Sequence, residues 1–319
     1  MEGKKVKSAS EKCAIEGARI DAHAYLLGTP PIREFMEVLR ARRLNGTCAQ
    51  EDELAHEWRR AAHYIRELEA AEGGCVENAA LISLPAEMEG FARRELEDPC
   101  VERSLGLLPY RWALVDLDQL VVHQRSVDLT FIESLKAAFP KSPTDEELFR
   151  FAAGRLRQAP DVRVTRTSEN VYTFSSASSD LRFLDIALLD PQTVHGYHAP
   201  GHAAAVVGVF VGFGANFLCA LRMQGRLILS NGTHRAHMLY ELGIRRVPCL
   251  VREVSCDDDL DLIGATDVKQ NLQVYLRARR PPRLKDFFDP QLRKIIPVAA
   301  ASRLVHVQVN TQRSRVSIG

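Results

Sequence analysis

The sequence predicts a mixed α/β protein, and three observations support that class. Helical apolar spacing dominates the first third of the chain, whereas short runs rich in β-branched residues, bounded by glycine turns, follow from residue 109 onward. The composition, with 46% hydrophobic and 26% charged residues, is that of a folded globular protein and excludes disordered, collagenous and fibrous chains. At 319 residues the chain can bury roughly three quarters of its surface.

Residues 1–108 are predicted to form an N-terminal helical region. Pro30-Pro31 opens a first helix that Asn45-Gly46 closes, as expected of proline at a helix start and glycine beyond its end. A second helix is predicted from about residue 51 to residue 71, and a third begins at Pro85. The apolar positions of the second helix form one stripe, which belongs in the core or could face a second copy of the chain in a homodimer: Leu54, Trp58, Ala61, Ile65 and Leu68.

Residues 109–254 are predicted to form an α/β core that carries an insert at about residues 140–204. Within this core, Thr130-Phe131-Ile132-Glu133 matches a capping box at a helix start, and Ser142-Pro143 is expected to cap the next helix. Gln224-Gly225 is predicted to be the turn between two strands.

The C-terminal extension, residues 255–319, is expected to contain short helices followed by a hairpin. Its last segment alternates Val305, Val307 and Val309 with other residues, which is the period-two pattern of a strand. Basic residues gather between Arg277 and Lys285. Because acidic neighbours dilute their charge, we expect a solvated surface there.

One stretch approaches the length of a membrane helix: Ala203–Leu221 spans 19 residues and has Asn216 as its polar side chain. Glycines interrupt it and valines dominate it, which favours a buried strand, a glycine turn and a second strand. The N-terminus shows no apolar signal core. We therefore expect a cytoplasmic protein with no membrane partner.

Charge and cysteine content narrow the function classes further. A net charge of +1 excludes binding to DNA through an overall positive field, so contact with DNA needs a local patch. The seven cysteines are odd in number, widely spaced and include no Cys-x-x-Cys pair. Reduced thiols are therefore expected rather than a disulfide framework.

The segment Asn231-Gly232-Thr233-His234-Arg235 lies between a predicted strand and a predicted helix. A helix start carries partial positive charge and unpaired N–H groups, so it normally attracts acidic residues. His234 and Arg235 stand there instead, which is favourable when an anion binds between them, and Gly232 lets the backbone approach that anion. We expect Asn231 or Thr233 to cap the helix and Arg235 to bind phosphate oxygens. The alternative is that Arg235 pairs with a carboxylate inside the fold and His234 is packed.

Around this segment the chain resembles the ParB/sulfiredoxin superfamily. Residues 227–251 are similar to its strand, Gly-x-x-Arg turn, helix and Val-Pro strand. Residues 115–120, followed by His123-Gln124-Arg125, are similar to its opening strand and loop. The likeness covers less than one third of the chain, and it extends to ParB-like bacterial proteins without an assigned activity that carry an Asn-Gly-Ser/Thr-His-Arg motif. The fold that it implies for the core is the ParB/sulfiredoxin-like one.

The resemblance also implies a ligand, because members of the superfamily bind nucleotides through this turn. The implied ligand is a nucleoside phosphate, either ATP, ADP or CTP, accompanied by Mg²⁺. His234 and Arg235 would neutralise phosphate charge during catalysis. The residues of this chain that match the binding set are Asn231, Gly232, Thr233, His234 and Arg235, together with His123 and Arg125.

The branches of the superfamily differ at positions that this sequence can test. Thr233 stands where sulfiredoxins have a catalytic cysteine, so their redox chemistry is not expected. Partition ParB proteins continue into a helix-turn-helix, and none is evident after residue 254. In the free-serine kinase branch a loop glutamate acts as base, but here Gln124 stands in that place, and an amide cannot accept the proton. The nearest candidate bases in the sequence are Asp116, which we favour, Asp118 and Glu133.

A second polar cluster precedes the apolar stretch. His195, His198 and His202 lie within eight residues of a loop that contains glycine and proline. Three imidazoles at these spacings could bind a metal ion or phosphate, although loop histidines are more often solvated or packed. We treat a metal site here as the minority interpretation.

Together these features predict a nucleotide-dependent enzyme that transfers a phosphoryl group to a small-molecule acceptor or hydrolyses the nucleotide. Two alternatives stay open: a non-catalytic, nucleotide-gated module of the partition type that binds DNA, and a ParB-like nuclease. A DNA-cleaving site needs a carboxylate pair near the turn, which the sequence does not clearly provide. DNA is therefore not the favoured partner.

Overall fold

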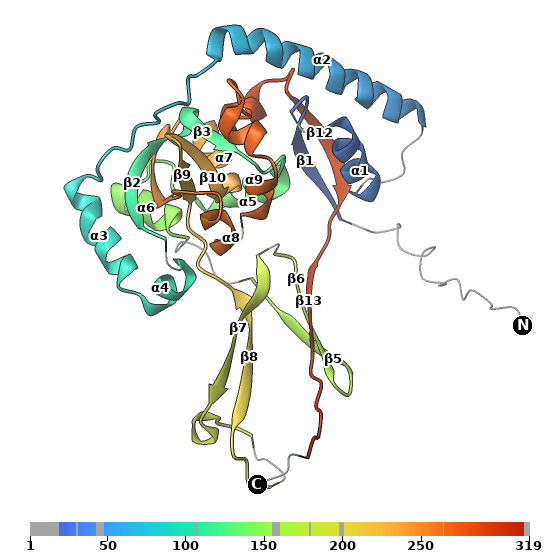
Figure 1. Ribbon diagram of the computed structural model, residues 1–319, viewed down its shortest axis with the longest axis vertical. Helices are drawn as coiled ribbons and strands as arrows, with labels where there is room; N and C mark the ends of the chain where they lie inside the picture. The colour runs from blue at the N-terminus through green and yellow to red at the C-terminus, as the bar shows by residue number, and fades with distance from the viewer. Residues whose placement is uncertain are drawn as a thin grey trace, which may run out of the picture. The chain divides into compact units, whose positions relative to one another are not determined.

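The computed structural model describes most of the chain, in eight segments: residues 19–29, 31–42, 48–105, 108–154, 160–178, 180–197, 201–263 and 265–315. These residues form a mixed α/β protein, which confirms the predicted class (Figure 1). The chain divides into two compact units, the first made of residues 1–156 and 217–300 and the second of residues 157–216 and 301–319. The units cut the chain differently from the predicted domains. The first unit holds the N-terminal region, the predicted core apart from residues 157–216, and the extension up to residue 300.

The first unit is built on a five-stranded mixed sheet with the strand order β2-β11-β9-β10-β3. Strands β9 and β10 form the hairpin predicted at Gln224-Gly225, where both residues have positive φ angles. Strand β10 runs parallel to β3, and β11 runs parallel to β9. The bounds of the five strands are β2 (Tyr110–Asp116), β3 (Leu120–Val122), β9 (Cys219–Met223), β10 (Arg226–Asn231) and β11 (Arg246–Glu253).

Three helices accompany this sheet, and their caps differ from the predicted ones. Helix α5 (Leu129–Ala138) is capped by Asp128, whose Oδ1 accepts the Phe131 N–H at 2.9 Å. The capping box predicted at Thr130 is therefore wrong, and the Thr130 hydroxyl accepts the N–H of Ala22 instead. Helix α6 (Asp145–Ala152) begins with a capping box formed by Thr144 and Glu147, directly after the predicted Ser142-Pro143. Helix α7 (Thr233–Glu241) follows β10 as predicted.

The N-terminal region is not helical throughout, because it begins with strand β1 (Ile20–Leu26). This strand lies between β12 (Arg293–Ala299) and β4 (Ser126–Asp128) in a three-stranded antiparallel sheet. Its partner strands lie more than one hundred residues away in the sequence, so no local sequence pattern predicted this strand. The helices of the region are α1 (Ile32–Arg42), α2 (Cys48–Glu72), α3 (Ala86–Leu96) and α4 (Pro99–Leu105).

Helix α2 places its apolar stripe in the core. Leu54 and Ala61 are buried, and Trp58, Ile65 and Leu68 pack against the same cluster as Phe35 of α1 and Ile296 of β12. The stripe therefore belongs to the interior of the first unit.

The end of α2 is held by an ion-pair cluster that corrects the prediction of a solvated basic surface. Arg280 and Arg283 are buried, and both donate to the carboxylate of Glu72, as does Lys285. Arg280 also donates to both oxygens of the buried Asp286, at 3.2 and 2.7 Å. Burial raises the pKa of Glu72, but Lys285, Arg283 and Arg280 outweigh it and lower that pKa to about 2.

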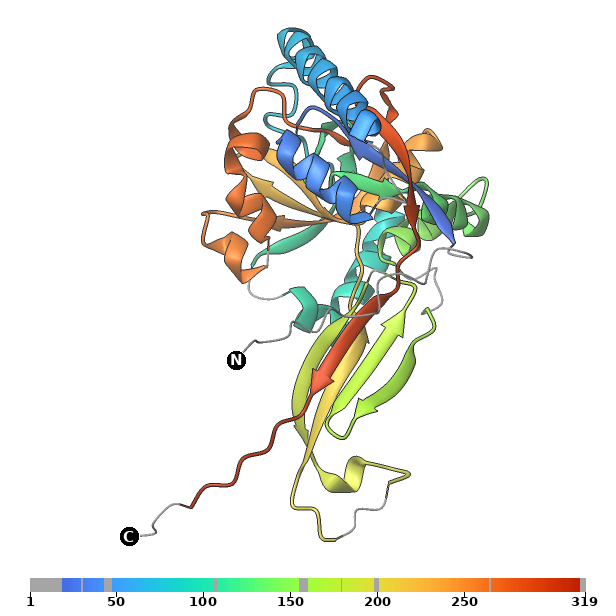
Figure 2. The same ribbon diagram turned by 90° about the vertical axis from the view of Figure 1, so that its right-hand side faces the viewer.

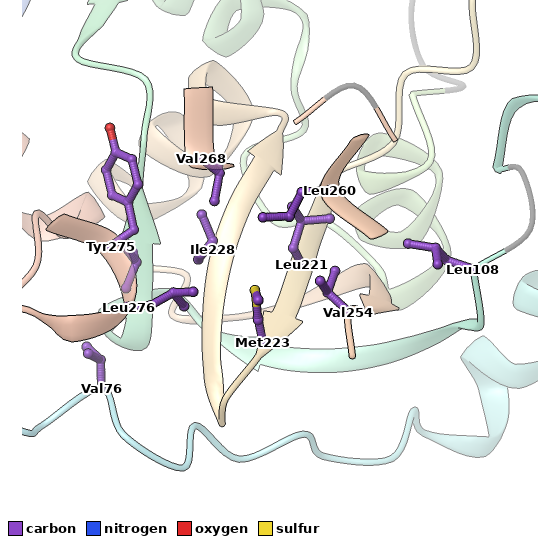
Figure 3. Packing of buried hydrophobic residues seen from close by; sticks show 11 residues of the cluster. Val76, Leu108, Leu221, Met223, Ile228, Val254, Leu260, Val268, Tyr275 and Leu276 are labelled. Carbon is purple, nitrogen blue, oxygen red and sulfur yellow. The ribbon is translucent and has the colours of Figure 1, made fainter. Parts of the chain in front are cut away.

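The C-terminal helices cover one face of the main sheet, and Figure 3 shows their side chains pointing toward those of the strands. Leu221 and Ile228 from the sheet pack with Leu260 and Val268 from these helices in one buried cluster. The elements concerned are α8 (Asp259–Leu262), α9 (Thr266–Gln270) and the π-helical turn η3 (Gln273–Arg277). The 3₁₀ turn η4 (Leu284–Phe288) instead contacts α7 and another 3₁₀ turn, η1 (Leu117–Gln119), which joins β2 to β3.

The second unit consists of strands. β13 (Arg303–Gln308), β6 (Val171–Ser176) and β5 (Arg163–Ser168) form one sheet, and β7 (Leu181–Leu189) pairs with β8 (Val206–Phe213) in a hairpin (Figure 2). The hairpin predicted within residues 303–318 does not form among the described residues, because 303–308 pair with β6 as strand β13 and 309–315 contain no strand. A 3₁₀ turn, η2 (Pro191–Thr193), follows β7.

The long apolar stretch forms two strands, as predicted, but the first of them, β8, has no buried residue, so the expectation of a buried strand is wrong there. Strands β8 and β9 lie in different sheets and do not pair. In the part of the chain that the structure describes, no helix is both long and apolar enough to span a membrane.

A buried histidine makes the stability of the first unit sensitive to pH. His237 of α7 is 2% exposed and lies against the rings of Phe287 and Phe288, with neither ring nitrogen hydrogen-bonded to a described residue. Its Nδ1 lies 4.0 Å from the Glu241 carboxylate. Burial, reinforced by the positive charges of Arg293 and Lys136 and by His234, lowers the pKa of His237 to about 3.

The free energy of unfolding should therefore decrease as the pH falls below about 6.5, the pKa of His237 in the unfolded chain. The unfolded chain binds a proton at His237 that the folded chain rejects, so each pH unit lost above pH 3 costs up to about 1.4 kcal/mol. Between pH 7.5 and pH 5 this amounts to about 2 kcal/mol. Urea unfolding should show that His237→Leu loses this part of the pH dependence, whereas the exposed His63→Leu keeps it. An unchanged pH dependence in His237→Leu would contradict the assignment.

Candidate functional site

The parallel pairing of β3 and β10 builds the candidate site. Leu120, Val121 and Val122 lie opposite Leu227, Ile228 and Leu229, so both strands end at the same edge of the sheet. His123-Gln124-Arg125 follows β3, and Ser230-Asn231 ends β10. β1 fixes the first loop, because the N–H of Leu26 donates to the Arg125 carbonyl at 2.8 Å.

A cleft of about 550 Å³ opens at this edge. It lies wholly within the first unit and receives side chains from the β1–α1 segment, from the two loops, and from α9 and η3. The lining residues are Tyr25, Leu26, Glu34, Phe35, His123, Gln124, Arg125, Ser126, Ser230, Asn231, Asp267, Gln270, Asn271 and Tyr275. Three of the predicted ligand residues, His123, Arg125 and Asn231, therefore meet in one place.

His123 is a neutral group of the cleft at physiological pH. Burial lowers its pKa below the ordinary value, and Arg125 adds to that shift. A hydrogen bond with the Ser230 backbone and the negative charge of Asp267 oppose it. The same hydrogen bond joins the loop after β3 to the end of β10.

Arg125 contributes a guanidinium to the cleft, and this group is hydrogen-bonded to two other lining residues. It donates to the carboxylate of Glu34, and it is hydrogen-bonded to the Tyr275 hydroxyl. Burial would lower the pKa of Arg125, but these two partners raise it above its ordinary value. Burial raises the pKa of Tyr275, so the phenol remains protonated.

The rest of the cleft is acidic and amide-rich. Glu34 and Asp267 contribute two carboxylates against the single guanidinium of Arg125. Gln124 also lines the cleft, but its Nε2 donates to the Ser126 carbonyl at 2.9 Å, which fixes the loop. This charge balance does not favour a bare polyanion.

The turn before α7 depends on the left-handed backbone conformation of Gly232. Gly232 occupies the N-cap position with φ +87°, and a Cβ there would lie 3.0 Å from the Leu218 Cα, so glycine is required. The expectation that Asn231 or Thr233 caps the helix is wrong, because Asn231 Oδ1 accepts the Gly232 N–H at 2.7 Å and no side chain caps α7. Thr233 is buried.

Arg235 does not line the cleft. It is 8% exposed, and its Nη1 donates to the carbonyls of Phe151 and Ala152 at 3.0 and 2.9 Å. These carbonyls form the negative end of α6, so the end of one helix dipole neutralises the cation at the start of another. Arg235 therefore has partners inside the fold, as in the alternative interpretation, and the carbonyl end of α6 provides two of them.

His234 is also engaged within the first unit. Its Nε2 accepts the Asp128 N–H at 3.0 Å, and its ring meets the Phe131 ring edge-on at 5.2 Å. An accepting Nε2 carries no proton, so this contact requires the neutral ring. The cleft therefore gathers Asn231 from the predicted turn, but not the segment from Gly232 to Arg235.

The predicted bases lie elsewhere than in the cleft lining. Asp116 precedes β3, whereas His123 follows it, and the Asp116 carboxylate accepts the Asp118 N–H at the start of η1. Asp118 accepts the Tyr240 hydroxyl, and Glu133 pairs with Lys136.

The histidine loop shows no metal site in its described part. His195 and His202 are exposed, and His198 lies outside the described residues. Across the described segments, no group of three His, Cys, Asp or Glu side chains is arranged to hold a metal ion.

The residues that sequence analysis missed come from distant elements. Glu34 lies on α1, Asp267 on α9 and Tyr275 on η3. No sequence motif marks these three residues, because each lies within an ordinary helical segment. The tertiary fold brings them beside the loop after β3. Comparison of the chain with family models, curated proteins and solved structures finds no match.

The contact between Arg235 and α6 predicts a loss of stability in Arg235→Ala. The variant leaves the Phe151 and Ala152 carbonyls without this donor in a buried position, which should cost about 3 kcal/mol of unfolding free energy. Denaturant unfolding measures the difference. Arg150→Ala, at an exposed position on α6, should cost less than about 1 kcal/mol. Wild-type stability in Arg235→Ala would show that the guanidinium is not needed by α6.

Proposed function

We propose that the cleft at the ends of β3 and β10 binds a nucleoside phosphate together with a divalent cation. The observation that supports the proposal is the convergence of His123, Arg125 and Asn231, three residues of the expected binding set, on a single cleft. Its volume, about 550 Å³, lies within the range of small-molecule sites, about 300–1,000 Å³.

The lining suits a nucleoside. Tyr25, Phe35 and Tyr275 contribute to the wall of the cleft, and each of them is less than 5% exposed. Gln270 and Asn271 supply amide donors and acceptors that match the edges of a base or the hydroxyls of a ribose.

The phosphates belong beside Arg125 and Asn231. Asn231 lines the cleft and has a side-chain amide N–H that can donate to a phosphate oxygen, whereas the start of α7 does not line it. Arg125 supplies N–H donors suited to phosphate oxygens. Of the anion site that the sequence predicted, these two residues are the ones expected to contact the phosphates in the cleft.

The two carboxylates explain why a cation should accompany the phosphates. Glu34 and Asp267 would repel a bare triphosphate, and Mg²⁺ would offset their charge. We assign Glu34 to the cation, because Mg²⁺ is held in proteins by one or two carboxylates plus phosphate oxygens. The described residues provide no metal site of their own, so the ion would arrive with the nucleotide.

For chemistry, we assign the role of proton acceptor to Asp267. The cleft-lining Gln124 cannot accept a proton, and Asp116 does not line the cleft. Asp267 lines it and acts electrostatically on His123. The proposed reaction is phosphoryl transfer to a small-molecule acceptor or hydrolysis. Binding without turnover would identify the nucleotide-gated module, which the amide at position 124 favours.

Titration calorimetry with ATP, ADP and CTP in the presence of Mg²⁺ tests the binding site. Arg125→Ala should weaken the binding of the preferred nucleotide by about 1.5–3 kcal/mol, because a charge-assisted hydrogen bond is lost. Arg33→Ala removes a guanidinium that is 88% exposed on the same α1 helix as Glu34, and it should bind like the wild type. Equal affinities in folded Arg125→Ala and wild-type protein would count against the site.

Asp267→Asn separates binding from chemistry. The amide keeps the size of the side chain but cannot accept a proton, so nucleotide affinity should change by less than about tenfold while turnover falls by about 100-fold or more. Following phosphate release or transfer alongside calorimetry measures both. Full turnover in Asp267→Asn would exclude this carboxylate as the base.

A further inference from the structure

The β7–β8 hairpin of the second unit has one face without a polar side chain. In its antiparallel register Phe183 lies opposite Val211, Ile186 opposite Val209 and Leu188 opposite Val207. Residues opposite one another share a face of the sheet, so these six side chains lie together. We call this set the β7–β8 apolar face: Phe183, Ile186, Leu188, Val207, Val209 and Val211.

Much of this face is exposed. The exposed fractions are 52% for Phe183, 58% for Ile186, 75% for Leu188 and 61% for Val207. With about 180 Å² for a fully exposed side chain of this size, these four leave roughly 450 Å² of apolar surface uncovered. The largest apolar patch on a typical monomer is about 300–600 Å² and often functional.

The opposite face of the hairpin also exposes apolar side chains, Leu184 at 43% and Phe210 at 44%, but its own leucines fill part of it. A Cβ on Gly208 would lie 2.8 Å from Leu189 Cδ1, and one on Gly212 would lie 3.4 Å from Leu184 Cδ1. Leucine side chains therefore occupy the space above both glycines. Arg182 and Asp185, opposite Gly212 and Phe210, make this face partly polar.

We propose that the β7–β8 apolar face packs against the same face of a second copy of the chain, forming a homodimer related by a two-fold axis. A face with six apolar and no polar side chains requires an equally apolar partner, and a two-fold copy supplies one of matching size and shape. Two antiparallel sheets pack face to face in this way in β-sandwiches. The proposal is independent of the cleft.

Two features of the hairpin set the expected strength of the contact. The uncovered area is about half of the 800 Å² that each partner contributes to a standard interface, so the dimer should be reversible in the micromolar range. Strand β8 carries no charge and no proline, the features with which edge strands usually prevent association.

Sedimentation of the full chain between about 1 µM and about 200 µM tests the proposal. The mean mass should rise with concentration from that of one chain toward that of two. A monomer over the whole range overturns the proposal. A monomer that binds neutral phosphatidylcholine vesicles through the hairpin also overturns it, because lipid would then be the occupant of the face.

Matched variants locate the contact. Ile186→Lys combined with Leu188→Lys places charges on the apolar face and should weaken dimerisation by at least about 100-fold. Phe210→Lys places a charge at a residue that is 44% exposed on the opposite face of the same hairpin, and it should leave the dimer intact. Circular dichroism establishes that both variants are folded. Dimerisation that survives the double variant, or that Phe210→Lys weakens equally, contradicts the assigned face.

Discussion

The parallel contact between β3 and β10 is the constraint on which the candidate site depends. It consists of three residue pairs, and their six side chains are almost completely buried. This contact joins segments about one hundred residues apart and brings the loop after β3 beside the end of β10. His123 then bridges the two through its hydrogen bond with the Ser230 backbone. Parallel strands place their following loops at one edge, and ligands bind there in many open α/β sheets.

Several arginines of this chain are buried and have their partners inside the fold. Arg235 neutralises the carbonyl end of α6, and Arg280 and Arg283 hold the end of α2 through Glu72. A buried cation needs such partners, because an unpaired one would cost several kcal/mol, on the order of 3–5 kcal/mol. In sequence these residues resemble a phosphate-binding turn and a basic surface. The fold shows that their electrostatic requirement is met by helix ends and by carboxylates.

Local signals predicted much of the first unit. Proline before α1, the apolar stripe of α2, and the strand, glycine turn and helix of β10 and α7 are encoded within short windows, so their positions were foreseen. Strand β1 was missed because its partners β4 and β12 are distant in sequence. The caps of α5 and α6 were misplaced by a few residues, because several Asp, Ser and Thr residues compete for the role.

The site was predictable only in part for the same reason. His123, Arg125 and Asn231 belong to two motifs, and each motif lies at the end of a predictable strand. Glu34, Asp267 and Tyr275 carry no motif, since their role arises from where α1, α9 and η3 pack. The two carboxylates among them change the expected ligand from a bare nucleotide to one that carries a cation.

The most direct test of the central claim is a crystal structure of the protein grown with Mg²⁺ and the nucleotide that binds it most tightly. The account predicts density for the nucleotide in the cleft, with its phosphates between Arg125 and Asn231 and its base beside Gln270 and Asn271. Density for the nucleotide at another place on the protein, or no nucleotide in the cleft at saturating concentration, would contradict it.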